Sequence, residues 1–363
     1  MVQDPQTTLS ENGGEGSPQR RRATMRDVAA LAGVSIKTVS RVVNQEAGVS
    51  GDLADRVEAA ARQLDYRPDL TASNLRRGRR TATLGMMLEN VANPYSGAVH
   101  RAVDDAAIER GMAVLATSLD EDPVREREVA RTMIQRRVDG MVIMPTGTDQ
   151  SYLRPEIEAG LAAVFVDRQP RFLDADTVLA TNRAGARGAV EHLIGMGHTR
   201  IAFLGDLIDI ATAEDRYKGY LEAMSSAGIL VDDRLVRTDL HTRDTAQRAA
   251  ESLLRLPADD GPTALFASQN LITIGALQAL HLHDLQHLVA LVGFDDIELA
   301  GMLDPGVTVV AQDPYAIGRA AAELLFARLD GYAGPSEHRT ISTRLIIRGS
   351  GEIRPREEPA RRA

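Results

Sequence analysis

The chain has 363 residues, 44% of them hydrophobic and 26% charged, which is the composition of an ordinary globular protein of two or three domains. It contains no cysteine, which excludes disulfides, thiolate metal sites and cysteine nucleophiles. No apolar run reaches the roughly 18 residues of a membrane span, and the polar start of the chain lacks the apolar segment of a secretion signal. We therefore expect a cytoplasmic protein with no membrane partner, whose residues 1–23 form a disordered arm.

The net charge of −9 conceals a division along the chain. Residues 20–80 carry thirteen Lys and Arg against seven Asp and Glu, a net charge of +6. Residues 81–363 carry 29 basic and 41 acidic residues, a net charge of −12. A basic segment beside an acidic body is typical of a module that binds a polyanion, although a solvated basic face has the same composition.

The basic segment opens with a predicted helix over residues 25–32. Thr24 stands directly before this helix and Asp27 follows three residues later, which is the signature of a capping box. Gly33 comes after the last apolar residue and favours the left-handed turn that ends many helices. Both ends of the first helix are therefore marked in the sequence.

Two further helices are predicted, one over residues 36–44 and one that starts after Ser50. Ser35 is the N-cap of the former, and Pro68 stops the latter because proline cannot continue the hydrogen-bond ladder. The apolar residues of the three helices recur at helical spacing and predict a small core. The expected core residues are Val28, Ala29, Val34, Val39, Val43, Leu53, Val57, Ala60, Ala61 and Leu64.

A helix, a glycine turn and a second helix form a helix-turn-helix, whose second helix enters the DNA major groove. Lysine and arginine donate to guanine, isoleucine contacts the thymine methyl group, and short hydroxyls bind phosphates. Many helix pairs with this spacing are purely structural, so spacing alone leaves that alternative open. The DNA-contacting residues predicted in these helices are Thr24, Ser35, Ile36, Lys37, Thr38, Ser40, Arg41 and Asn44.

From residue 81 onward short apolar runs alternate with amphipathic stretches of helical length, which predicts parallel sheets joined by helices. The runs outnumber the strands of one doubly wound sheet, so we expect two α/β lobes with a ligand cleft between them. The predicted strands are TLGMML, AVLATS, GMVIMP, AAVFVD, TVLATN, RIAFLG, TALFAS, LVALVGF and VTVVAQ.

Two other classes of protein fit the sequence less well. An enzyme is disfavoured because no glycine-rich phosphate loop and no GxSxG elbow are present. His283 and His287 are four residues apart, close to His281, and could bind a metal, but they lie where a helix should end, so no metal and no cofactor is predicted. A secreted sugar-binding protein would share the two lobes but requires a signal peptide.

The run TMRDVAALAGVSIKTVSRVVN, followed by VEAAARQLDYRPD and NLRRG, closely resembles the LacI/GalR family of transcription regulators. Further on, the chain resembles that family's sensor domain in the motifs NPY, VDR, GHTRIAFLG, RYKGY, GFDD and RLIIRGS, which follow in the same order. The resemblance covers residues 24–350. It implies a sequence-specific repressor that binds double-stranded DNA at a palindromic operator as a homodimer and responds to a small-molecule effector.

The resemblance also implies a domain organisation. An N-terminal three-helix helix-turn-helix head over 24–69 is joined by a hinge helix and linker over 70–80 to a two-lobed sensor over 81–350 of the periplasmic-binding-protein-like type I fold. In the hinge, Leu75 matches the leucine that wedges into the minor groove, and Arg76 lies beside it to neutralise phosphate. The tail over 351–363 lacks an apolar heptad, so no C-terminal coiled coil is predicted.

The family's effectors are commonly sugars held between the lobes. By matching position, the resemblance assigns effector binding to Tyr95, Ser96, Asp167, Arg168, Arg216, Gln269 and Asp295. Carboxylates and guanidinium groups suit a polyol, since charged groups make strong hydrogen bonds to hydroxyls. Each of these residues also has a structural alternative, such as a helix cap or a local ion pair.

The chain departs from the family at three places in this pocket. Ser96 replaces an aromatic residue, Gln269-Asn270 replaces Asn-Asp, and Thr181 replaces an acid. The identity of the effector therefore does not carry over. Three modes of control stay open, namely an inducer that weakens DNA binding, a corepressor that strengthens it, and a protein partner with an unused pocket.

Overall fold

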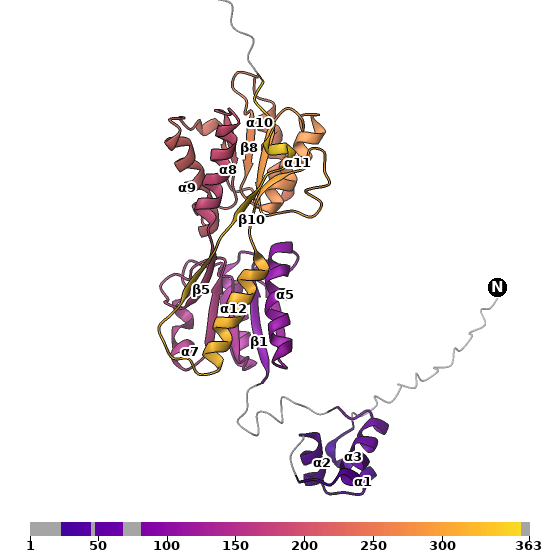
Figure 1. The fold of residues 1–363 in the computed structure, drawn as a ribbon. Coiled ribbons are helices and arrows are strands. Elements are labelled where there is room, and N and C mark those ends of the chain that lie inside the picture. The colour runs from indigo at the N-terminus through magenta and orange to yellow at the C-terminus, as the bar shows by residue number, and fades with distance from the viewer. Residues whose placement is uncertain (1–22, 45–47, 68–80, 357–363) are drawn as a thin grey trace, which may run out of the picture. The chain divides into compact units, whose positions relative to one another are not determined.

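The structure is a computed structural model that describes residues 23–44, 48–67 and 81–356. The chain divides into two compact units, residues 1–79 and residues 80–363, each of which is described by itself (Figure 1). The predicted arm up to residue 22, the hinge with Leu75 and Arg76, and the end of the tail lie outside the described residues. None of the helices in the described ranges is long and apolar enough to cross a membrane.

The first unit contains the three predicted helices, α1 Met25–Ala32, α2 Ile36–Val43 and α3 Gly51–Gln63. The capping box at the start of α1 is present, with the Thr24 backbone N–H donating to the Asp27 carboxylate at 2.7 Å. Gly33 ends α1 in the left-handed region, with φ at 64°. Ser50 precedes α3 as predicted, but its side chain makes no capping hydrogen bond.

The core of this unit follows the predicted pattern. Val28, Val39 and Val57 are fully buried, one from each helix. The remaining predicted positions are buried or half-buried around them, because each helix presents one apolar face to the other two. Arg56 of α3 donates to the carbonyl oxygen of Ala32 at 2.6 Å and so satisfies a carbonyl at the end of α1.

The second unit consists of two α/β lobes, each built on a six-stranded sheet within the described residues. The N-lobe sheet has the strand order β11-β5-β4-β3-β1-β2, and its helices are α5, α6, α7 and α12. The bounds of these elements are β1 Thr83–Leu88, α5 Pro94–Glu109, β2 Ala113–Ser118, α6 Pro123–Gln135, β3 Gly140–Ile143, α7 Arg154–Glu158, β4 Ala162–Val166, β5 Asp176–Ala180, α12 Pro314–Leu329 and β11 His338–Ile341.

The C-lobe sheet has the order β12-β10-β9-β8-β6-β7, with helices α8 to α11 around it. The bounds are α8 Asn182–Gly195, β6 Ile201–Leu204, α9 Ala211–Ser226, β7 Val236–Arg237, α10 Arg243–Leu254, β8 Ala264–Ala267, α11 Asn270–Leu282, β9 Ala290–Phe294, β10 Thr308–Ala311 and β12 Arg344–Ile346. Short 3-10 turns lie at Ser151–Leu153, Asp233–Leu235 and Gly349–Gly351.

All of the predicted apolar runs form strands, and three short strands were not predicted. β7, β11 and β12 lack a buried apolar run, since β11 alternates exposed and half-buried residues and β7 has only two residues. β12 also pairs antiparallel with β10, whereas a parallel arrangement was expected and the other described pairs are parallel. Sheet edges carry fewer apolar residues, so their strands are harder to detect in a sequence.

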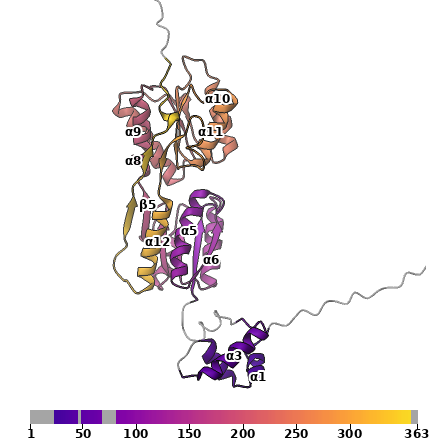
Figure 2. The same ribbon diagram turned by 45° about the vertical axis from the view of Figure 1, so that its right-hand side comes forward.

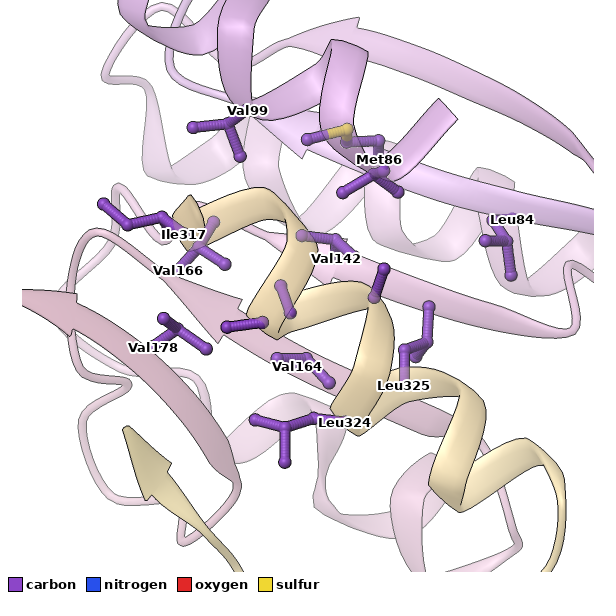
Figure 3. Close-up of a cluster of buried hydrophobic side chains, with 14 of the residues drawn as sticks. Leu84, Met86, Val99, Val142, Val164, Val166, Val178, Ile317, Leu324 and Leu325 are labelled. Atoms are coloured by element: carbon purple, nitrogen blue, oxygen red, sulfur yellow. The ribbon is translucent and has the colours of Figure 1, made fainter. Parts of the chain in front are cut away.

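The chain crosses between the lobes three times, after β5, after β10 and between β11 and β12 (Figures 1 and 2). As a result α12, which follows a C-lobe strand, packs on the N-lobe sheet. Figure 3 shows Ile317, Leu324 and Leu325 of α12 beside valines of β3, β4 and β5. Thr181 and Thr343 lie on two of the crossings, and the Thr343 backbone N–H donates to the Thr181 hydroxyl at 2.9 Å.

Residues that follow the predicted sensor boundary at 350 contact the C-lobe. Gly351 is buried, and its backbone N–H donates to the Thr308 hydroxyl at 3.0 Å. The carbonyl oxygen of Ile353 lies 2.8 Å from Nε2 of the buried His198. The first residues of the predicted tail therefore pack against the C-lobe.

Candidate functional site

The start of α2 has a capped end and exposed side chains on the face that points away from the core. The Ser35 hydroxyl accepts a hydrogen bond from the Thr38 backbone N–H at 3.1 Å, so the start of α2 is fixed. Ile36 is 46% exposed and Lys37 is exposed, whereas Val39 points into the core. A large apolar side chain at the surface beside a lysine is suited to a base edge in the major groove.

The other predicted DNA contacts also have local partners. Ser40, Arg41 and Asn44 are half-buried, and the Asn44 amide donates to the carbonyl oxygen of Ser40. Arg41 lies against the backbone of Gly48, because its guanidinium is 3.0 Å from the position of a β-carbon there. The helix α2 ends at Val43, one residue before its predicted limit, and Asn44 is its C-cap. Ile36 and Lys37 are the predicted base contacts with the most open surroundings.

A cleft between the two lobes of the second unit is lined by all of the predicted effector residues. It contains about 450 Å³ of space unoccupied by atoms, part of it open to solvent. Apart from Arg216, which lies in the second turn of α9, the predicted residues lie just after strands or at helix starts, where open α/β sheets bind ligands. The lining residues that the sequence did not point to are Glu89, Asn93, Glu121, Met144, Asp206, Ile210, Thr212, His241 and Gln312.

Arg216 of α9 is the most firmly held side chain in the cleft. Its Nε donates to Asn182 Oδ1 and one terminal nitrogen donates to the carbonyl oxygen of Ser268, both at 2.8 Å. Its guanidinium carbon lies 3.9 Å from the centre of the Phe294 ring. The same terminal nitrogen is 4.0 Å from an oxygen of Asp295, so the guanidinium is oriented before any ligand arrives.

Asp295 follows β9 and is buried. Burial raises the pKa of Asp295, while Arg216 and the hydrogen bond from Gln312 Nε2, at 2.7 Å, oppose the shift. Asp295 and its N-lobe counterpart Asp167, which follows β4, both have φ at 68°. Left-handed backbone is costly outside glycine, and both lobes adopt it at the residue that follows the strand and lines the cleft.

Arg168 forms a buried ion pair inside the N-lobe wall of the cleft. Its two terminal nitrogens donate to the two carboxylate oxygens of Glu121 at 2.7 and 2.6 Å, and its Nε lies 3.3 Å from Asp167. A bidentate pair of this kind fixes both side chains. A local ion pair, one of the structural alternatives to effector binding, is therefore present at Arg168, with Glu121 as its main partner.

Tyr95 and Ser96 lie in the first turn of α5, where Asn93 is the N-cap. Burial raises the pKa of Tyr95, and the nearby Asp167 and Asp295 add to the shift. Ser96 is fully buried, with its hydroxyl 3.7 Å from the sulfur of Met144. The serine in place of an aromatic residue leaves a hydroxyl and a thioether, instead of a flat ring, on this wall.

Gln269 and Asn270 begin α11 on the opposite wall. The Gln269 side-chain oxygen accepts from the Leu271 backbone N–H at 3.0 Å, so it caps the helix while lining the cleft. Asn270 Nδ2 donates to Asn93 Oδ1 at 2.8 Å and connects the two lobes. Thr181, the third departure from the family pattern, bonds to Thr343 at the crossings.

Two of the histidines near the end of α11, His281 and His287, have local partners. His281 Nδ1 lies 2.9 Å from the carbonyl oxygen of Leu277, one turn earlier in the helix. His287 lies 3.9 Å from Asp304. The helix ends at Leu282, as the sequence predicted for this segment, and His283 is its C-cap.

A helix-turn-helix head linked to a two-lobed α/β unit with a polar cleft defines the class of ligand-controlled transcription regulators. Comparison with known protein families agrees with this class. Residues 24–69 match the family described as bacterial regulatory proteins, lacI family, and residues 190–351 match a periplasmic binding protein-like domain.

Curated relatives match along nearly their whole length. The chain is 33% identical to the ribose operon repressor of Escherichia coli K12 over 331 residues, which are 90% of this chain and 99% of the relative. It is 30% identical to the repressor CytR of the same organism over 93% of this chain and 98% of the relative. A solved complex of the regulator CelR with cellobiose covers 91% of this chain and 100% of its own, at 30% identity and a TM-score of 0.66. The chain belongs to the LacI family and is a DNA-binding transcriptional regulator.

Proposed function

We propose that this regulator binds a palindromic operator through α2 and that a sugar bound in the cleft changes its affinity for the DNA. One observation carries the proposal. Seven residues that the sequence assigned to effector binding, from Tyr95 to Asp295, line a single cleft. The names of the relatives support a sugar, since one represses a ribose operon and another was solved with cellobiose.

Base reading is assigned to Ile36 and Lys37, with Arg41 as the third contact. The exposure of the first two supports this assignment, and the fixed Ser35 hydroxyl is suited to a phosphate. Leu75 and Arg76 remain assigned to the minor groove and its phosphates on the family resemblance alone. Control is by binding, without catalysis, in the cytoplasm where the operator lies.

In the cleft, Asp167, Asp295 and Arg216 are assigned to the hydroxyls of the sugar. Their fixed positions support the assignment, because groups that are already oriented lose little entropy when a ligand binds. Ser96 and Gln269 supply further polar contacts. The missing aromatic surface at Ser96 favours a ligand held by hydrogen bonds over one held by stacking, and ribose is the first sugar to test.

A homodimer is proposed because a palindromic operator needs two heads. Exposed apolar side chains on the sensor unit support self-association. Leu299 and Met302 are exposed on the C-lobe, and Leu115 is exposed on the edge strand β2 of the N-lobe. A contiguous apolar patch at a surface is typical of an interface, and Leu299 and Met302 lie three residues apart on the C-lobe.

The proposal is tested by selecting duplexes from a random pool with the full-length chain and repeating the selection with a panel of sugars. We expect one palindromic sequence to be enriched and one sugar to change its affinity. Loss of affinity identifies an inducer, gain identifies a corepressor, and a response to none of the sugars favours a protein partner. The proposal is wrong if no duplex is preferred over random competitor under any condition.

The variant Arg216→Lys tests whether the cleft is the effector site. It keeps the charge but loses the planar group that bonds Asn182 and Ser268. We expect operator selection to be unchanged and the response to the sugar to be reduced. If the variant responds like the wild type, the cleft is not the effector site.

A further inference from the structure

The cleft assigned to the effector carries more negative than positive groups. Its carboxylates, which come from both lobes, belong to Glu89, Glu121, Asp167, Asp206 and Asp295. Among the described residues that line it, the positive side chains are Arg168 and Arg216, beside the titratable His241. The net formal charge of the lining is therefore −3, or −2 when His241 is protonated. A concave site lined by one sign of charge concentrates ligands of the opposite sign.

Two of the positive groups are already occupied by carboxylates of the protein. Both terminal nitrogens of Arg168 donate to Glu121, and one of them lies 3.2 Å from the carbonyl oxygen of Pro145. Nδ1 of His241 lies 2.8 Å from Asp206. A phosphate or carboxylate group on a ligand would therefore have to displace one of these acceptors to gain a counter-charge.

Arg216 has a nitrogen left for a ligand, but an unfavourable one for an anion. Its Nη1 donates to Ser268 and lies 4.0 Å from Asp295, whereas no hydrogen bond within the described part of the chain involves its Nη2. A ligand hydroxyl can accept from Nη2. A phosphate at the same place would be repelled by Asp295 and by Asp167, which is near enough to raise the pKa of Asp295.

Glu89 is the carboxylate of the cleft that lacks a counter-charge. It forms no ion pair with another residue of the described ranges, and the hydrogen bond that its carboxylate accepts from Asn93 Nδ2 is 3.3 Å long. Burial and the nearby Glu121 raise the pKa of Glu89 to about 7, while Arg168 and His241 oppose the shift. An ionised carboxylate that has lost water without a counter-charge is unfavourable, and a cation brought by a ligand offsets that cost.

We propose that the effector carries a protonated amine beside its hydroxyl groups, and that Glu89 binds this cation while Asp295 and Arg216 bind hydroxyls. The inference rests on the proposed function for the existence of an effector and adds the charge of that effector. The class of ligand is an amino sugar or another amine-bearing polyol. Phosphorylated sugars and sugar acids are rejected, because they place a negative charge against unpaired carboxylates.

The first test measures the charge of the cleft in the full-length chain without DNA or effector. Because the chain has no cysteine, Ile210→Cys introduces a single thiol at a cleft position that is 7% exposed. Its rates of reaction with a cationic, a neutral and an anionic methanethiosulfonate reagent are compared. The neutral reagent corrects for access, and Leu230→Cys, at a position that is 93% exposed and outside the cleft, gives the ratio at the surface.

We expect the ratio of cationic to anionic rates to be roughly tenfold higher, or more, in the Ile210→Cys chain than in the Leu230→Cys chain. Adding Glu89→Gln should lower the ratio by roughly four- to tenfold, which is the effect of one unit charge about 6–10 Å away on two reagents of opposite charge in water. Glu109→Gln, at an exposed position of α5 outside the cleft, should leave the ratio unchanged. Equal ratios at the two thiols, or no effect of Glu89→Gln, would overturn the proposal.

The second test uses the ligands themselves. Each sugar of the panel for operator binding is compared with its amine-bearing and its phosphorylated derivative. We expect the amine to act at the lowest concentration, and Glu89→Gln to remove its advantage over the parent sugar. A phosphorylated derivative that acts at a lower concentration than its parent contradicts the proposal. Since the labelling rates are measured without DNA, a failure of operator selection leaves the first test unaffected.

Discussion

At the scale of single residues, the protein combines side chains that are fixed in advance with side chains whose charge can change. Arg216 is held by two hydrogen bonds and an aromatic ring, and Asp167 and Asp295 sit on left-handed backbone. Holding binding groups in place costs local stability but reduces the entropy lost when a ligand binds. Glu89 differs from them, because burial brings its pKa close to neutrality.

The first prediction concerns base reading by Lys37. Replacing Lys37 with alanine should cost about 1–3 kcal/mol at one operator position and relax the preference there, because a base contact is lost. Arg62→Ala removes a cation from the exposed side of α3 and should leave the sequence preference unchanged. Binding to a library of single-base operator variants measures both. Equal weakening on all sequences would place Lys37 on a phosphate.

The second prediction concerns acid stability and His198. Its ring nitrogens lie 2.9 Å from the Thr263 hydroxyl and 2.8 Å from the carbonyl oxygen of Ile353, and burial lowers the pKa of His198. A lowered pKa in the folded state means that the stability is present above the ordinary value of 6.5 and is lost as the pH falls below it. The melting temperature of His198→Gln should therefore depend less on pH than that of the wild type, between about pH 7 and about pH 5. Parallel curves for the two proteins would contradict this role.

At the scale of the elements, three helix pairs of the sensor unit meet at a glycine. A β-carbon at Gly219 of α9 would overlap the carbonyl oxygen of Arg183 in α8. Gly275 of α11 approaches α10 in the same way, and Gly318 of α12 approaches α5. Only glycine allows backbones to come so close, and the helices then cover their sheet without a gap.

The third prediction uses two glycines in one helix pair. Gly219→Ala should lower the free energy of unfolding by about 1–3 kcal/mol, because the added methyl group must push α8 and α9 apart. Gly188→Ala, in the middle of α8, meets no atom of the described residues within 4 Å and should raise it by up to about 1 kcal/mol. Urea unfolding of each variant measures the two changes, and equal effects would contradict the close packing.

At the scale of the whole molecule, the three crossings and the return of α12 join the lobes into one sensor. The hydrogen bond between Thr181 and Thr343 ties two of the crossings together, so the lobes are connected by a short hinge rather than a flexible linker. A hinge of this kind restricts the unit to opening and closing about the cleft. An effector that prefers one of these states shifts the population towards it.

The fourth prediction follows from this linkage. If the effector changes operator affinity by a given factor, the operator must change effector affinity by the same factor, typically about 5- to 150-fold. Titrating the effector into the free chain and into its operator complex measures the second factor. Unequal factors would mean that a further ligand, or a change of assembly, takes part in the switch.

The sequence by itself determined the helix-turn-helix head and nine of the twelve strands in the described residues. Helix caps such as Thr24 with Asp27, the turn at Gly33 and the buried apolar runs act between neighbours in the chain, so they can be read locally. The resemblance to the LacI family added the seven cleft residues, which do line one cleft. Whether they bind the effector, and whether Leu75 enters the minor groove, stay predictions.

Only the tertiary structure decided the edge strands and which ionisable residues gather in the cleft. β11 and β12 are short and contain no fully buried residue, and they become strands because the crossings bring them to the sheet edges. Glu89, Glu121, Asp206 and His241 belong to no motif and are far apart in the sequence. These residues come close together only in the folded sensor unit. The pKa of Glu89, raised to about 7, results from burial and from neighbouring charges in that folded unit.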